Sequence, residues 1–168
     1  MKLFMFSIGG DFRNANIELH DVRFSAGECA EDCYPDLRAQ WWGEPASLHL
    51  DCWGELRQAD GHDIVLRREP PAGGDRLFFV NLGGYDPDEF AELHRNVLLV
   101  APDAATAKAR ALSTVQHWSL PHRDNLFAIE KAVDVASAVE GRGWYIHLVP
   151  AAATVAFSFT CTYVPIGE

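Results

Sequence analysis

A chain of 168 residues corresponds to about one ordinary domain, and its 48% apolar and 23% charged residues are typical of a globular protein. The formal net charge of −10 disfavours binding to nucleic acid or anionic lipid, because no cluster of Lys or Arg offsets it. No apolar run reaches the length of a membrane span, and the apolar start of the chain ends at Gly9, so we expect an acidic cytoplasmic protein whose partner is a protein or a small molecule.

The first part of the chain predicts two strands, a short helix and two further strands. The Gly9-Gly10 pair after the first strand favours a turn, because glycine readily adopts positive φ. Pro35 suits the first turn of a helix and Gly43 suits the position after its end. In chain order we expect strands at 2–8 and 18–26, a helix at 36–42, and strands at 47–53 and 63–67.

The second part predicts the same order of elements. Asp103 is a good N-cap for a helix rich in Ala, Leu, Lys and Arg. The expected elements are strands at 76–82 and 92–101, a helix at 104–116, a strand after His122 and a strand at 144–149. Alternating apolar residues over 154–164 predict a last strand with one buried face, which extends a sheet edge or crosses to a second chain in a homodimer.

Identical residues recur 74 positions apart and predict an internal duplication. Seven of eighteen aligned positions match, against roughly one expected by chance. The matches are Leu3, Phe4, Gly9, Gly10, Glu18, Leu19 and His20 with Leu77, Phe78, Gly83, Gly84, Glu92, Leu93 and His94. We therefore expect an α+β fold of two β-β-α-β-β repeats related by a pseudo-twofold, mostly antiparallel, with helices on one face. The predicted parts are repeats at 1–68 and 76–150, a linker at 69–75 and an extension at 151–168, in one globular unit that shares a core.

Each repeat carries a Glu-x-His and a His-x-Asp motif, whose members share a strand face because side chains alternate along a strand. The candidate ligand-binding residues are Glu18, His20, His49 and Asp51, with Glu92, His94, His122 and Asp124 in the second repeat. One interpretation is structural, with each imidazole bonded to a carbonyl or carboxylate. The other is a divalent metal site, for which His20, His49 and Asp51 are the candidates, because two imidazoles and a carboxylate suit iron or zinc.

The four cysteines Cys29, Cys33, Cys52 and Cys161 are not repeated between the halves. Cys29 and Cys33 are four residues apart, but the sequence has no second cysteine pair to complete a zinc site. We expect all four to be free thiols of a cytosolic protein.

Three segments resemble a bacterial family known only as domain-of-unknown-function family 1543, in its two-copy form. They are residues 16–24, Trp41-Trp42-Gly43, and residues 47–51. The second half departs from this pattern, with Arg95 in place of Asp21 and Arg123 in place of Leu50. The resemblance implies no activity. A non-catalytic binding or interaction protein is the leading hypothesis, and the alternative is a metal-dependent hydrolase or oxygenase that uses the Glu, His and Asp motifs.

Overall fold

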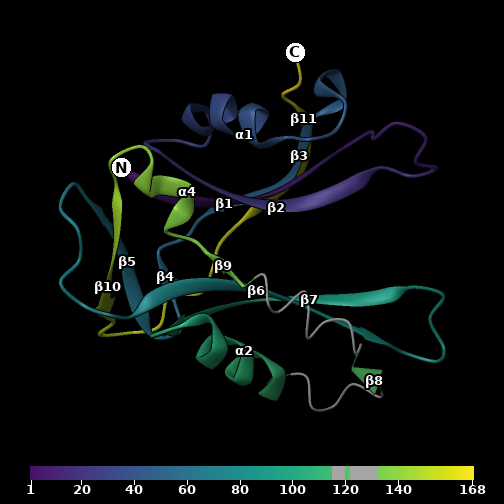
Figure 1. The fold of residues 1–168 in the computed structure, drawn as a ribbon. Helices are drawn as coiled ribbons and strands as arrows, with labels where there is room; N and C mark the ends of the chain where they lie inside the picture. The colour runs from purple at the N-terminus through teal and green to yellow at the C-terminus, as the bar shows by residue number, and fades with distance from the viewer. Residues whose placement is uncertain (115–119, 122–131) are drawn as a thin grey trace. The chain divides into compact units, whose positions relative to one another are not determined.

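The computed structural model describes residues 1–114, 120–121 and 132–168, and residues 120–121 are described by their backbone alone. The described chain divides into two compact units (Figure 1). Unit 1 comprises Met1–Gln58, Ile64–Leu66 and Ala151–Glu168. Unit 2 comprises Ala59–Asp63 and Arg67–Pro150. Both ends of the chain therefore belong to unit 1, and the predicted division into repeats, linker and extension stays a prediction.

Unit 1 is built on an antiparallel four-stranded sheet in the order β11-β3-β1-β2. Its strands are β1 (Lys2–Gly10), β2 (Leu19–Gly27), β3 (His49–Glu55) and β11 (Thr160–Pro165). Phe4, Phe6 and Ile8 occupy alternate positions of the central strand β1, so they share one face of the sheet and make that face apolar. Three of the four strands predicted for the first part lie in this sheet and are confirmed, with shifts of one or two residues at their ends.

The apolar face of this sheet is covered by short helices, which are η1 (Glu31–Cys33), α1 (Tyr34–Gln40) and η2 (Pro45–Ser47). The core contains Phe6, Ile8 and Leu50 from the sheet and Leu37 from α1, all fully buried. Helix α1 begins two residues before the predicted start, because the preceding 3-10 turn leads directly into it, and Pro35 lies in its first turn as expected. This core therefore lies on one side of the sheet, and the opposite side carries Gly9 together with buried Leu3 and Phe24.

Unit 2 contains a second antiparallel sheet in the order β7-β6-β8, with β9 also paired to β6. Its strands are β6 (Arg76–Tyr85), β7 (Glu92–Ala101), β8 (Leu120–Pro121) and β9 (Val133–Asp134). Helices α2 (Ala104–Ser113) and α4 (Ser137–Glu140) and strand β10 (Tyr145–Pro150) complete the unit, and β4 (Gln58–Ala59) and β5 (His62–Arg67) are divided between the units. The mostly antiparallel α+β fold is confirmed.

Helix α2 confirms the predicted cap. The carboxylate Oδ1 of Asp103 accepts a hydrogen bond of 2.8 Å from the amide of Thr106, which satisfies one of the exposed N–H groups at the start of the helix. Ala107 and Ala111 of α2 pack on Val80 and Leu99 of the sheet in the core of unit 2. The helix ends at Ser113, three residues before the predicted end.

A second carboxylate, Asp60, ties a turn of unit 2 to its sheet. Asp60 and Gly61 both have positive φ, the backbone that two-residue turns require. Asp60 accepts hydrogen bonds of 2.8 Å from the amide of Val100 and from Arg110. Burial by itself raises the pKa of Asp60, but the hydrogen bonds from Arg110 and Val100 outweigh it and hold the pKa below the ordinary value of 3.8.

We expect the Asp60→Asn variant to lose about 1 kcal/mol of unfolding free energy at neutral pH, because asparagine tolerates the turn but lacks the charge. A lowered pKa stabilises the folded state above the unfolded-state value and stops doing so as the pH falls through the folded-state value. Wild type and variant should therefore converge as the pH falls below 3.8 in urea unfolding experiments. A difference that stays constant with pH would contradict this assignment.

The C-terminal segment differs from the prediction in its burial. The strand is shorter than expected, and Val155, Phe157, Phe159 and Tyr163 are exposed rather than buried. Their alternation predicted a buried face, but the segment runs along a sheet edge as an irregular stretch before β11 begins. The first alternative for this strand is confirmed, since β11 pairs with β3 of the same chain.

The prediction of four free thiols is wrong for two cysteines. Cys52 and Cys161 form a disulfide between directly opposed residues of β3 and β11, with a Cα–Cα distance of 4.1 Å. Cys29 and Cys33 carry no disulfide. The pairing depends on the register of two strands 109 residues apart, which the spacing of cysteines cannot show. Among the described residues, we find no helix with the length and apolar character needed to cross a membrane.

Candidate functional site

Gly9 is the centre of a polar cluster on the sheet of unit 1. It lies on β1 between two strands, and the register places His20 of β2 and His49 of β3 directly opposite it. Residues directly opposite in an antiparallel sheet share a face. The two imidazoles therefore flank Gly9 on one face, with their ring centroids 6.3 Å apart.

The missing side chain of Gly9 gives the two imidazoles their space. A Cβ placed on Gly9 would lie 2.7 Å from Cδ2 of His20 and 2.8 Å from Nε2 of His49, closer than such atoms approach in proteins. The Gly9-Gly10 pair does not form the expected turn, because both residues continue β1 and pair with β2. Glycine is needed at position 9 because it has no side chain, which leaves room for the two imidazoles, and not because it can adopt positive φ.

Two carboxylates complete the cluster. Oε2 of Glu18 lies 3.6 Å from Nε2 of His49, and the two oxygens of Asp51 lie 3.5 Å from Nε2 of His49 and 3.5 Å from Nε2 of His20. Ligand atoms of Glu18, His20 and His49 all lie within 4.8 Å of one another. The structure brings these four residues together, although 28 residues that include a helix separate His20 from His49.

The distances within the cluster fit a bound ion better than direct hydrogen bonds. A hydrogen bond from nitrogen to oxygen spans about 2.7–3.2 Å, and the contacts here are longer. Two ligand atoms on a tetrahedral zinc ion, each about 2.0–2.1 Å from it, are about 3.3 Å apart. The spacing of 3.5–3.6 Å is therefore close to an edge of a coordination tetrahedron.

A backbone carbonyl fixes the tautomer of His49. Its Nδ1 lies 3.0 Å from the carbonyl oxygen of Ser47, and because a carbonyl only accepts, Nδ1 must carry the proton. In the neutral ring, the lone pair of Nε2 then points toward the carboxylates of Glu18 and Asp51. His49 is only 1% exposed, so a cation or a second proton has to offset the repulsion between the Nε2 lone pair and the two carboxylates. Histidine ligands of metals commonly donate their other N–H to a carbonyl in this way.

Asp51 has an unsatisfied oxygen. Its Oδ2 is buried and has no hydrogen-bond partner among the residues that the structure describes, since Nε2 of His20 lies at 3.5 Å. The β1–β3 register shifts between Ser7 and Ile8 and leaves Asp51 without a partner on β1. Such bulges commonly redirect a side chain at a functional site. Asp51 is thus a carboxylate held at the cluster, and its oxygen Oδ2 is available to coordinate an ion.

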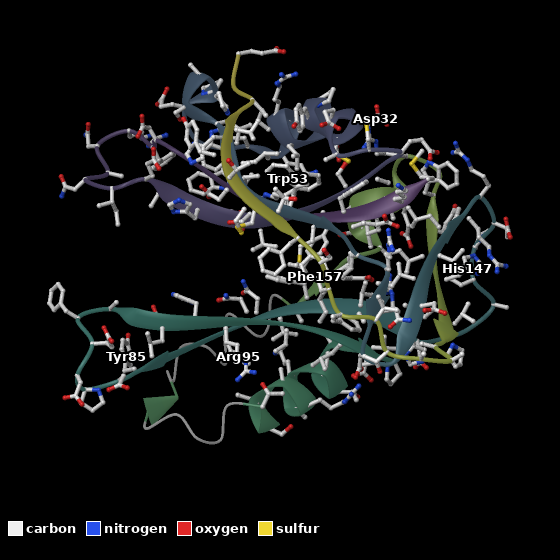
Figure 2. All side chains as sticks on the ribbon, turned by 180° about the vertical axis from the view of Figure 1, so that it is seen from behind. Asp32, Trp53, Tyr85, Arg95, His147 and Phe157 are labelled. Atoms are coloured by element: carbon white, nitrogen blue, oxygen red, sulfur yellow. A yellow bond between two sulfur atoms is a disulfide. The ribbon has the colours of Figure 1, made fainter. Side chains whose placement is uncertain are left out.

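The site is closed on one side and open on the other. The ring of Tyr163 on β11 lies over the ring of His49, with centroids 4.5 Å apart. Farther along the same edge, the ring of Phe157 packs against Gly54, and Figure 2 shows this C-terminal segment beside β3, where Trp53 is labelled. The side chains of His20 and Glu18 are 53% and 49% exposed, so solvent reaches the cluster from β2. The imidazole of His49, by contrast, is almost fully buried.

The second half of the chain does not assemble an equivalent cluster among the described residues. His94 lies opposite Gly83, as His20 lies opposite Gly9, and its Nε2 is 3.7 Å from Glu92. Its Nδ1, however, lies 3.2 Å from Oδ1 of Asn81, which belongs to a polar row that includes Asn96. The other two candidates, His122 and Asp124, lie outside the described residues.

Comparison with known proteins identifies relatives without a known role. The profile of the family described as Domain of Unknown Function (DUF1543) matches residues 15–66, the segment that contains Glu18, His20, His49 and Asp51. The chain is similar to the crystal structure of a protein Il1583 from Idiomarina loihiensis, with 30% sequence identity, a TM-score of 0.69 and 99% of each chain covered. No curated protein matches the chain.

Proposed function

This chain belongs to the DUF1543 family, a domain of unknown function, and we propose that it binds a divalent transition metal at Glu18, His20, His49 and Asp51. The observation that carries this proposal is the spacing of 3.5–3.6 Å between imidazole nitrogens and carboxylate oxygens. This spacing is too long for hydrogen bonds and close to that of ligands around one ion. The protein is then a metal-binding protein, and no catalytic step is needed to account for the site.

The structural interpretation of the same residues requires protons in place of the ion. His49 would have to be doubly protonated while almost fully buried, and its Nε2–H would point between two carboxylates at distances too long for strong hydrogen bonds. Oδ2 of Asp51 would remain buried without a partner among the described residues. A single cation compensates both features, because it accepts the lone pair of His49 and an oxygen of Asp51 together.

The ligand set favours zinc or iron(II) over magnesium or calcium. Two imidazole nitrogens and two carboxylate oxygens suit first-row transition metals, whereas magnesium and calcium prefer oxygen ligands alone. The Nδ1–H of His49 bonded to Ser47 supplies the usual outer hydrogen bond of such a ligand. The net charge of −10 also raises the local concentration of cations around the protein.

The test is elemental analysis of the full chain purified without chelator, followed by titration of the metal-free protein with Zn²⁺ and Fe²⁺. We expect at least one tightly bound ion per chain, and we expect His20→Ala and His49→Ala each to lose one equivalent. Because His49 is buried and its variant could misfold, Glu18→Gln provides a second test at a half-exposed position. It should weaken binding by roughly tenfold or more without affecting the fold.

His94→Ala is the matched control. His94 also lies opposite a glycine and beside a glutamate, but it contacts Asn81 rather than a second imidazole in the described part of the chain. The His94→Ala variant should keep the equivalent of metal that is lost in His49→Ala. Folded wild-type protein that contains no metal and takes up none on titration would rule out the proposal.

A metal-dependent enzyme is the second candidate, and the exposure of the β2 side of the site favours it. Glu18 and His20 are half exposed, so a water molecule or a substrate could reach an ion held there. A metal with an exposed position can activate water for hydrolysis. Ester or phosphoester hydrolysis that requires added Zn²⁺ and disappears in His20→Ala would support this candidate over simple binding.

We also propose that the chain is a two-copy form of the family and acts in the cytoplasm. The seven matched residues of the two halves support the first proposal, and the opposition of Gly9 to His20 and of Gly83 to His94 repeats in the two sheets. The second proposal rests on the acidic, globular composition of the chain.

A further inference from the structure

Tyr163 covers the most buried ligand of the proposed metal site. Its ring lies over the imidazole of His49 at 4.5 Å between centroids, tilted by 33°. His49 is 1% exposed, whereas Tyr163 itself is 62% exposed. The tyrosine therefore forms an outer wall of the site, and movement of this side chain would open His49 to solvent.

Strand β11 holds Tyr163 in an irregular part of its pairing with β3. Cys161 pairs with Cys52 and Val164 pairs with Leu50, and the register shifts between these two pairs. Tyr163 lies within this shift, so its position depends on what holds β11 before and after it.

The two attachments that flank Tyr163 differ in kind. After it, Ile166 is buried in the core of unit 1, its amide donates to the carbonyl of Leu48, and its own carbonyl accepts from Nε of Arg38 at 2.6 Å. Before it, the Cys52–Cys161 disulfide joins β11 to β3 next to Asp51. The attachment at Ile166 is noncovalent packing, while the attachment at Cys161 can be broken by reduction.

We propose that the Cys52–Cys161 disulfide controls access to the metal site by holding Tyr163 over His49. The inference rests on the proposed metal-binding function. A dithiol reductant attacks the disulfide, becomes a disulfide itself and leaves Cys52 and Cys161 as two thiols. The segment before Val164 is then held to β3 only by noncovalent contacts, namely strand pairing and the packing of Phe157 on Gly54. Tyr163 moves away from His49, and the ion exchanges faster. Disulfides of cytosolic proteins are often reversible in this way.

The first experiment measures release of Zn²⁺ from the loaded full chain to a fluorescent chelator in excess. A phosphine is used as the reductant because it binds zinc weakly, and it is oxidised to the phosphine oxide with an oxygen from water. We expect about tenfold faster release after reduction, a change that corresponds to about 1.4 kcal/mol. The double variant Cys52→Ser, Cys161→Ser should release the ion at the fast rate with or without reductant.

Two results of this experiment would overturn the proposal. Equal release rates from oxidised and reduced wild type would mean that the disulfide does not control access. Slower release from reduced wild type, absent from the double serine variant, would mean that a freed thiolate has become a ligand of the ion.

The second experiment measures the cover over His49 without any metal. Diethyl pyrocarbonate acylates accessible imidazoles, and peptide mass spectrometry separates His49 from His20. Reduction should speed acylation of His49 by about tenfold and leave half-exposed His20 unchanged, as expected if release and acylation share one opening step. If reduction speeds acylation of His49 in a protein that binds no metal, the redox-controlled cover stands and the metal-binding proposal is wrong. If reduction leaves acylation of His49 unchanged, the proposal that the disulfide holds Tyr163 over His49 is wrong.

Discussion

Replacing Gly9 by alanine is expected to weaken metal binding severely while leaving the sheet of unit 1 folded. The added Cβ would lie 2.7 Å from Cδ2 of His20 and 2.8 Å from Nε2 of His49. His20 is half exposed and can move outward, but His49 is packed under Tyr163 and bonded to Ser47. The methyl group would therefore separate the two imidazoles at the point where both must reach one ion. We expect affinity for Zn²⁺ to fall by about a hundredfold or more, measured by titration.

The fold should tolerate this change better than the site does. Overpacking of one methyl group costs about 1–3 kcal/mol, and alanine fits the backbone of Gly9 because its φ is not positive. Gly74→Ala is a matched control, since a Cβ there meets no atom within 4 Å, and it should bind metal as wild type does. If Gly9→Ala binds Zn²⁺ with unchanged affinity, the two imidazoles do not share an ion and the proposed site is wrong.

The sequence predicted the strands that carry the site and the partnership of the site residues. Alternation placed Glu18 with His20 and His49 with Asp51, and both pairs lie on one face of the sheet in the structure. The recurrence of Gly9 and His20 as Gly83 and His94 marked the positions that face each other across two strands. Proximity of the two motifs was an assumption, because only the sheet order shows that β2 and β3 flank the same strand.

Features that depend on tertiary register could not be predicted from local patterns. Gly9 was interpreted as a turn residue because a Gly-Gly pair usually signals one, whereas the register shows that it makes room for two rings. The cover by Tyr163 and the Cys52–Cys161 disulfide both follow from β11 returning to β3 across most of the chain. The sequence did place Cys161 and Tyr163 on one predicted strand. Nothing in the sequence, however, showed that β3 is the strand paired with it.

The surroundings of His94 differ from those of His20 because two nearby positions carry asparagine in the second half of the chain. Val22 of the first half lies where Asn96 lies in the second, and Ser7 lies where Asn81 lies. Nδ2 of Asn81 donates to Oδ1 of Asn96 at 2.6 Å, and Oδ1 of Asn81 lies 3.2 Å from Nδ1 of His94. Among the described residues, Nε2 of His94 has Glu92 at 3.7 Å beside it but no second imidazole. We therefore infer that repetition of the Glu-x-His motif does not by itself imply repetition of the metal site.

Removing the Cys52–Cys161 disulfide is expected to destabilise unit 1 by about 2–4 kcal/mol, the usual range for a native disulfide. The two cysteines are 109 residues apart, so the cross-link restricts a long loop of the unfolded chain. The loss should be larger than that of any single surface contact described above, because exposed ion pairs contribute about 1 kcal/mol or less. Urea unfolding of the double variant Cys52→Ser, Cys161→Ser, compared with oxidised wild type, measures this difference.

Hydrogen exchange locates the loss within the protein. Amides of β3 and β11 should exchange faster in the double variant, while those of β6 and β7, which belong to unit 2, should keep their protection. Cys29→Ser serves as the control, because Cys29 is exposed and carries no disulfide, and its unfolding midpoint should equal that of wild type. Equal midpoints for the double variant and oxidised wild type would show that Ile166 and the strand pairing alone hold β11 in place. The disulfide could not then control Tyr163, because β11 would be equally well fixed without it.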